Sequence, residues 1–168
     1  MIFILMISAI SAETKEESLH NLNIKKIIVN PNKINNSDYE YGKMLYPQYD
    51  YEGLPNNFMI KKTPDISFVP KDIKLIEVIK EPWIPDNMLE FTVNIFFNPS
   101  GQRKINPYSN QNINKKVALE IDSKILVIGT ILEKIENEMQ VIINKKTAQT
   151  IAAELRKVSN NVIIKGKN

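Results

Sequence analysis

The segment 117–127 carries the pattern of a β-hairpin, which constrains the fold of this chain more than any other feature. Apolar side chains at 117, 119 and 121 alternate with Ala118 and Glu120, the two-residue period of a strand with one buried face. Asp122 and Ser123 then provide a turn, and a second apolar run follows at 125–127. We therefore expect an antiparallel pair of strands here.

Further strands and two helices are expected around this hairpin. Apolar runs predict strands at 24–29, 58–60, 75–79, 89–97, 139–143 and 162–164. Asn98 and Pro99 begin one helix, as N-cap and first helical residue, and Pro107 is expected to kink or break it. Asn144 begins a final helix. Its apolar face is formed by Ala148, Ile151, Ala152 and Leu155, with Glu154 on the opposite face.

The order of these elements predicts an α+β fold. We expect an antiparallel or mixed sheet with two helices packed on one face, a two-layer domain of the ferredoxin-like type. The domain is expected to occupy residues 58–165, after a polar arm at 13–57 that is rich in asparagine and tyrosine.

Residues 1–12 precede the arm and are mostly apolar. They end in the small residues Ser11 and Ala12 before a charged run, which is typical of a secretory signal. A buried N-terminal strand is the alternative. The signal predicts an exported protein of the periplasm or cell envelope.

Composition argues against several classes of function. The chain has 168 residues, no cysteine and one histidine, His20, which argues against disulfides, a thiol nucleophile and a zinc site. The net charge of +3 comes almost wholly from lysine, because Arg103 and Arg156 are the only arginines. Nucleic-acid binding is therefore disfavoured, since base and phosphate recognition relies on arginine.

No catalytic constellation is apparent in the sequence. The five glycines are scattered, so there is no phosphate-binding loop. The nearest approach to a carboxylate cluster flanks the prolines of an expected loop and comprises Glu77, Glu81, Asp86 and Glu90. We expect these to be solvated charges, and we expect no catalytic residue, metal, cofactor or small-molecule substrate.

Candidates for contact with a partner are aromatic and apolar. Five of the six tyrosines lie close together in the arm, at Tyr39, Tyr41, Tyr46, Tyr49 and Tyr51. They form either a surface for a ligand or an arm whose rings pack back on the domain. Ile128 and Leu132, in and after the hairpin, are further candidates, although both are also suited to completing the core.

Four motifs occur in order between residues 58 and 157. Residues 59–64 read MIKKTP, and a strand LEFTV at 89–93 is followed by a helix start NPSGQRKI at 98–105. The hairpin region 113–125 reads INKKVALEIDSKI, and the closing helix 144–156 reads NKKTAQTIAAELR. In this order the motifs resemble the head subdomain of the first periplasmic domain of SecD and SecDF, membrane components of bacterial protein export. Ser123 stands where that family has a turn glycine, and Pro107 interrupts the family helix.

The resemblance implies a head on its own, without the transmembrane helices that couple a proton gradient to export. In the family the head contacts the emerging chain, so we expect a non-enzymatic module that assists export or binds unfolded chains in the envelope. Its partner would be a polypeptide or an envelope protein, and it would meet the membrane only through that partner. A structural or interaction protein of the envelope with no transport role is the alternative, and a small hydrolase is the least favoured.

Overall fold

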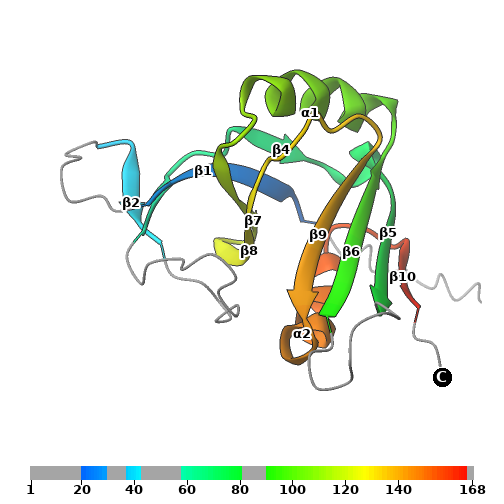
Figure 1. Ribbon diagram of the computed structural model, residues 1–168. Coiled ribbons are helices and arrows are strands. Elements are labelled where there is room, and N and C mark those ends of the chain that lie inside the picture. The colour runs from blue at the N-terminus through cyan, green and yellow to red at the C-terminus, as the bar shows by residue number, and fades with distance from the viewer. Residues whose placement is uncertain (1–19, 30–36, 43–57, 81–89, 166–168) are drawn as a thin grey trace, which may run out of the picture.

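We describe the protein from a computed structural model, which describes residues 20–29, 37–42, 58–80 and 90–165. These residues form strands, two α helices and one 3-10 helix (Figure 1). The strands are β1 Leu22–Val29, β2 Tyr39–Tyr41, β3 Phe58–Lys61, β4 Ile66–Phe68, β5 Ile73–Lys80, β6 Glu90–Phe97, β7 Lys116–Ile121, β8 Lys124–Thr130, β9 Glu138–Asn144 and β10 Val162–Lys165. The helices are η1 Pro70–Asp72, α1 Pro99–Gln111 and α2 Lys145–Leu155. The expected α+β class is confirmed, but the strands divide between two sheets where one was expected.

The first sheet is antiparallel and is organised around β1. Its strand order is β2-β3-β1-β7-β8, and β4 also pairs with β1. One half of β1 pairs with β4 and the other half with β3, while β7 pairs along the opposite edge. The region expected to be a polar arm therefore supplies the central strand of this sheet, and the folded unit does not begin at residue 58.

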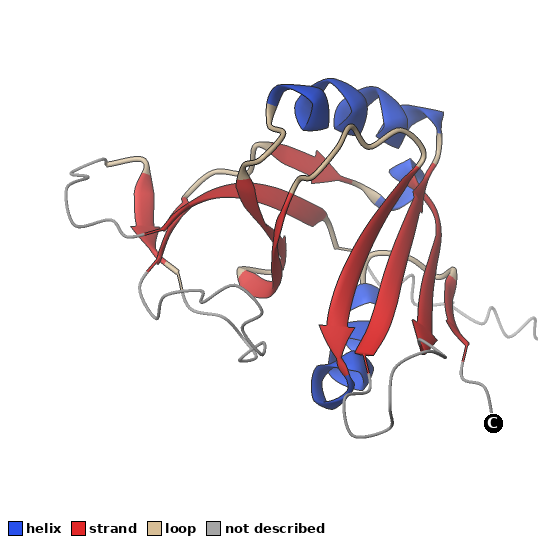
Figure 2. Ribbon diagram, in the orientation of Figure 1, coloured by secondary structure: helices blue, strands red, loops and turns tan. Residues whose placement is uncertain are grey.

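The second sheet is mixed and has the strand order β10-β5-β6-β9. Strand β10 is parallel to β5, and the other neighbours are antiparallel. Helix α2 contacts all four strands. Helix α1 lies across one end of the molecule, where it contacts η1, β4 and β6 (Figure 2). The two helices thus cover different parts of the molecule.

Two apolar clusters stabilise this arrangement. The main core contains buried residues of both sheets and both helices, among them Leu22, Phe68, Ile95, Ile105 and Ile151. All four residues expected on the apolar face of α2 belong to it. A smaller cluster comprises Ile27, Phe58, Ile60, Ala118, Ile125 and Ile128. Strands β1 and β7 contribute to both clusters, so both of their faces are buried.

Three local expectations need correction. Helix α1 runs through Pro107 without ending there, because Pro107 is exposed and the helix tolerates one missing hydrogen bond. Asn98 is the N-cap residue, but its amide donates to the carbonyl of Lys71 and not to the helix. Glu154 is only 8% exposed, because α2 meets the hairpin turn on the side expected to face solvent.

The hairpin turn agrees with the sequence. Asp122 and Ser123 have φ angles of 50° and 62°, the positive values that a two-residue turn of this kind requires. Ser123 thus adopts the backbone conformation for which glycine is favoured. Within the described ranges, neither helix has the length and apolar character needed to cross a bilayer.

Candidate functional site

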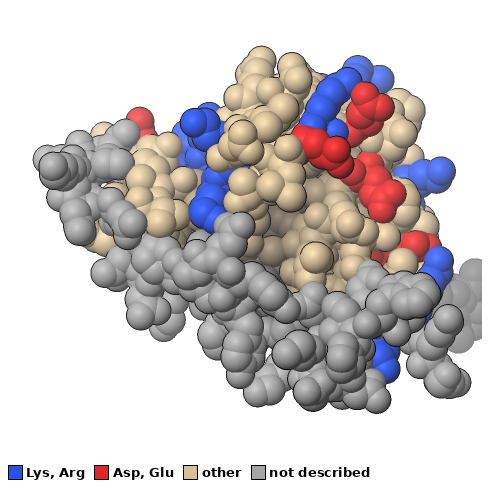
Figure 3. Space-filling model, viewed as in Figure 1, with Lys and Arg blue, Asp and Glu red and all other residues tan. Residues whose placement is uncertain are grey.

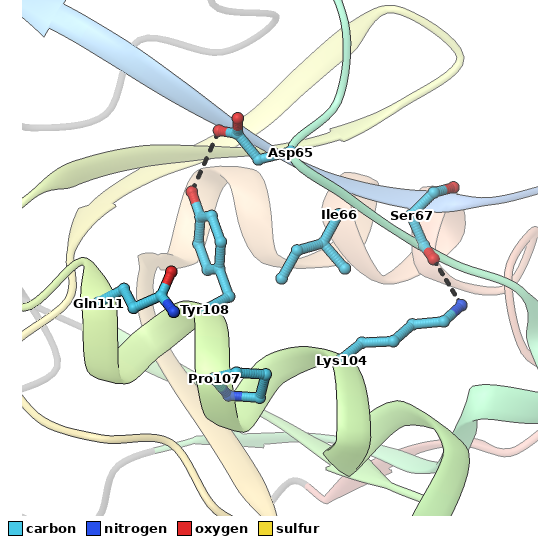
Figure 4. Close-up of a pocket in the computed structure, with 7 residues that line it drawn as sticks. All are labelled: Asp65, Ile66, Ser67, Lys104, Pro107, Tyr108 and Gln111. Carbon is cyan, nitrogen blue, oxygen red and sulfur yellow. Dashed lines mark hydrogen bonds between the residues drawn. The ribbon is translucent and has the colours of Figure 1, made fainter.

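A hollow of about 430 Å³ lies between β4 and α1 (Figure 4). It is lined by Asp65, Ile66, Ser67, Lys104, Pro107, Tyr108 and Gln111. The α1 residues Lys104, Tyr108 and Gln111 are spaced by four and three positions, and Pro107 lies beside Tyr108, so one face of the helix presents them to the hollow. The opposite wall comes from β4 and the residue before it.

Asp65 is the polar centre of this hollow. Its largely buried carboxylate accepts hydrogen bonds from the backbone N–H of Lys26 at 2.9 Å, from Lys61 Nζ at 2.6 Å and from the Tyr108 hydroxyl at 3.2 Å. Burial, and then the negative charge of Asp65, raise the pKa of Tyr108. The hydrogen bond to Asp65 likewise raises the pKa of Lys61. Both donors therefore remain protonated at neutral pH.

A second ion pair closes the other end of the hollow. Lys104 Nζ donates to the carbonyl of Ser67 at 2.8 Å and to Asp72 Oδ2 at 2.5 Å. Burial opposes ionisation of Asp72, but hydrogen bonds, led by that from Lys104, outweigh it and hold its pKa below the usual range. Gly101 permits this close approach of α1, since a Cβ there would lie 2.4 Å from the carbonyl oxygen of Asp72.

These groups hold α1 against β4 and η1. The raised pKa values of Lys61 and Tyr108 and the lowered pKa of Asp72 lie away from neutral pH, whereas acid–base catalysis works best with a group that titrates near the working pH. Every buried side-chain nitrogen or oxygen of the described ranges has a hydrogen-bond partner. The hollow is thus suited to positioning the helix rather than to transferring protons. In the same ranges no three metal-ligating side chains gather.

The predicted contact residues have different environments. Tyr41 in β2 is 74% exposed and Leu132, just after β8, is 77% exposed, while Tyr39 is half-buried. Ile128 is buried in the smaller apolar cluster, because its side chain points to the inner side of β8. Its burial agrees with the alternative that it completes the core. Tyr46, Tyr49 and Tyr51 lie outside the described residues.

Sequence reasoning missed the outward side of β9. Ile142 is 59% exposed, and Glu138 and Gln140 on the same side are exposed as well. The signal was available, because alternation along 138–144 separates these residues from Met139 and Ile143 in the core.

His20 contacts the hairpin turn, with Nδ1 2.6 Å from Asp122 Oδ1.

Comparison with known proteins gives structural matches only. No family model matches the chain, and no curated protein matches its sequence. Two solved structures superpose on more than four-fifths of it. They are the "Crystal structure of SecDF in Super-membrane-facing form", with a TM-score of 0.51, and the "Structure and function of a membrane component SecDF that enhances protein export", with a TM-score of 0.50.

The chain shares its fold with part of SecDF. The superposition covers 83% of this chain and 19% of the first SecDF chain, and 84% of this chain and 64% of the second. Sequence identity is 18% in both cases, so the likeness concerns the fold alone. It agrees with the expected resemblance at the coarse level of a SecDF-like domain.

Proposed function

We propose that this protein is an exported, non-enzymatic module that contacts polypeptide and corresponds to the periplasmic head of SecD and SecDF. The observation that carries the proposal is the superposition of SecDF on 83% of the chain. SecDF itself is described as a membrane component that enhances protein export. A fold does not carry a function by itself, so the proposal needs direct tests.

The surface supports contact with an apolar or extended chain. Tyr41, Leu132 and Ile142 are large apolar or aromatic side chains that are mostly exposed. They lie in β2, after β8 and in β9, so each is a separate candidate point of contact. We therefore propose that the partner is an unfolded or emerging polypeptide in the cell envelope.

The first test is suppression of aggregation. The full chain is mixed with a reduced, carboxymethylated model protein during heating, and light scattering is recorded. We expect the scattering to fall in proportion to the added chain. Replacement Leu132→Ser should weaken the effect, whereas Lys134→Ser in the same exposed loop should not.

The second test concerns location and partner in the native host. Cell fractionation with mass determination of the N-terminus should find the protein in the envelope without residues 1–12. Crosslinking should capture exported chains. Envelope location without suppression or crosslinking would instead indicate a structural protein with no transport role, and retention of residues 1–12 in the cytoplasm would contradict export.

A further inference from the structure

Strand β9 is an edge strand of unusual regularity for this molecule. It pairs with β6 through seven consecutive residues, Glu138 to Asn144, without a bulge. The strand order β10-β5-β6-β9 leaves its other side without a hydrogen-bonded strand among the described residues, and β8 of the first sheet contacts β9 without pairing with it. Natural proteins usually protect such an edge with proline, lysine, a bulge or a very short strand.

The other sheet edges show this protection, and β9 does not. Strand β2 has three residues and β10 has four. The pairing of β8 with β7 is interrupted by a register shift between Leu119 and Glu120. Strand β9 has the sequence EMQVIIN, which contains neither proline nor lysine.

The hydrogen-bonding direction of β9 follows from its register. The N–H of Phe97 donates to the carbonyl of Asn137 at 2.9 Å, immediately before the first registered pair. Opposite residues of an antiparallel pair alternate between hydrogen-bonded and non-hydrogen-bonded pairs. The backbone groups of Met139, Val141 and Ile143 therefore bond to β6, and those of Glu138, Gln140 and Ile142 point away from it.

The outward backbone groups repeat at the spacing of a strand. Outside the helices and strand ladders, no backbone–backbone hydrogen bond of the described residues uses the N–H or carbonyl of Gln140 or Ile142. Their side chains are exposed, and that of Gln140 donates to Asn94 Oδ1 at 3.3 Å across the sheet. A row of unpaired donors and acceptors at this spacing is complementary to one kind of partner, an extended backbone.

Charge near the start of β9 adds a preference. Glu133, Glu136 and Glu138 are exposed, and the one lysine among them, Lys134, already donates to Glu136 Oε1 at 2.8 Å. Figure 3 shows acidic side chains beside basic ones on the face that it displays. A partner with a basic residue at this end is therefore favoured.

We propose that the outer edge of β9 binds an extended polypeptide segment as an added antiparallel strand of the second sheet. The segment carries a β-branched apolar residue beside Ile142 and lysine or arginine at its C-terminal end, which an antiparallel direction places near Glu138. This inference rests on the proposed function, because it names the site and the chemistry of the polypeptide contacted.

The test uses a fluorescein-labelled peptide of alternating valine and threonine with C-terminal lysines, and binding is measured by fluorescence anisotropy. Two further peptides carry N-methyl groups at alternate residues, one on each edge of the extended backbone. We expect one N-methylated peptide to bind about tenfold more weakly or worse, since several main-chain hydrogen bonds are lost. The other should bind as the parent does, and the protein is unchanged in this comparison.

A matched pair of variants tests the edge itself. Gln140→Pro removes an N–H that points away from β6, so it leaves the ladder intact, while Gln140→Ala keeps that N–H. We expect peptide affinity to fall about tenfold in Gln140→Pro and to stay within about twofold in Gln140→Ala. Replacing the terminal lysines of the peptide by glutamates should also weaken binding.

Each remaining outcome overturns the proposal in a distinct way. Equal binding of both N-methylated peptides excludes strand addition. Aggregation suppression that survives in Gln140→Pro, with no peptide binding by the wild-type chain, keeps the proposed function but refutes this site. Absence of both suppression and peptide binding refutes the function and the site together. A wild-type dimer that Gln140→Pro dissociates in sedimentation velocity would show that a second copy occupies the edge.

Discussion

Glu154 shows how a single charged residue acquires a structural role through its neighbours. Its carboxylate accepts hydrogen bonds from Lys157 Nζ at 2.7 Å and from Lys124 Nζ at 3.2 Å. The bond from Lys157 lowers the pKa of Glu154, burial opposes this, and Lys124 adds to the lowering. A carboxyl whose pKa is lower when folded stabilises the protein above its unfolded pKa of about 4.3 and loses that contribution as the pH falls through the folded value.

We expect Glu154→Gln to reduce the free energy of unfolding by about 1 kcal/mol at neutral pH, because both lysines lie near solvent and limit the gain. The difference from the wild type should shrink as the pH is lowered below about 4. Urea melts at neutral pH and at about pH 3 measure it. Glu133→Gln, at an exposed loop position, is the control and should leave stability unchanged at both pH values. A difference that grows in acid would contradict the lowered pKa.

The buried ion pair between Lys25 and Glu120 is a second case in which charged residues acquire a structural role from the residues around them. Lys25 Nζ in β1 lies 2.8 Å from Glu120 Oε2 in β7, and each side chain is 7% exposed. Both lie on the face of the smaller apolar cluster, since Lys25 is two residues from Ile27 and Glu120 two residues from Ala118.

Removal of one partner leaves the other charge buried. We expect Lys25→Met to lower the free energy of unfolding by about 3–5 kcal/mol, and the double variant Lys25→Met with Glu120→Leu to recover most of that loss. Thermal and urea unfolding of the single and double variants form the cycle. A double variant no more stable than the single would mean that the pair itself, and not the uncompensated charge, dominates the stability.

At the scale of elements, α1 tolerates a residue that ordinarily ends a helix. Pro107 is exposed, and the anchors of the helix are the buried Ile105 and the contacts of Lys104 and Tyr108 with Asp72 and Asp65. Tertiary contacts on one face of the helix therefore offset the poor helix propensity of proline.

This balance predicts a stabilising substitution. Pro107→Ala restores an internal N–H and removes the ring, so we expect the free energy of unfolding to rise by about 1–3 kcal/mol. Arg103→Ala, at another exposed position of the same helix, should change it by less than about 0.5 kcal/mol, since arginine and alanine have similar helix propensities. Circular dichroism during urea unfolding measures both. A loss of stability in Pro107→Ala would show that the ring itself contributes to packing.

At the scale of the whole molecule, strand β1 and the later elements share one apolar core. Leu22 and Ile24 of β1 lie in the main apolar cluster with residues of both helices. Strand β1 pairs with β3 and β4 along one edge and with β7 along the other. Without β1 these strands would lose their shared neighbour, and the first sheet would be divided.

We expect a chain that begins at Phe58 to lack cooperative unfolding, and a chain that begins at His20 to keep it. Far-ultraviolet circular dichroism with urea titration distinguishes the two. The longer chain is the matched control, since it lacks the expected signal and the first part of the arm. A stable fragment beginning at Phe58 would show that β1 is dispensable and that the boundary expected from sequence is the physical one.

The same molecule shows which features sequence can predict. The hairpin, β6, β9, the N-terminal start of α1 and the apolar face of α2 were all predicted, because alternation, capping and helical spacing are local properties of the chain. Strands β2 and β4 were missed, since three residues are too few for a period to be recognised. Sequence left open whether Leu132 and Ile128 lie at the surface or in the core, and only the tertiary structure shows that Leu132 is exposed and Ile128 buried.

By itself the sequence determined the α+β class and the approximate limits of most strands and helices. Only the tertiary structure decided that the strands divide into two sheets, that β1 lies at the centre of one, and that β9 lies at the edge of the other. It also brought Asp65 to Tyr108 and Lys124 to Glu154, pairs separated by 43 and 30 residues. The physical reason is that local patterns set the conformation of a segment, whereas pairing between distant segments depends on how the whole chain closes and buries its apolar faces.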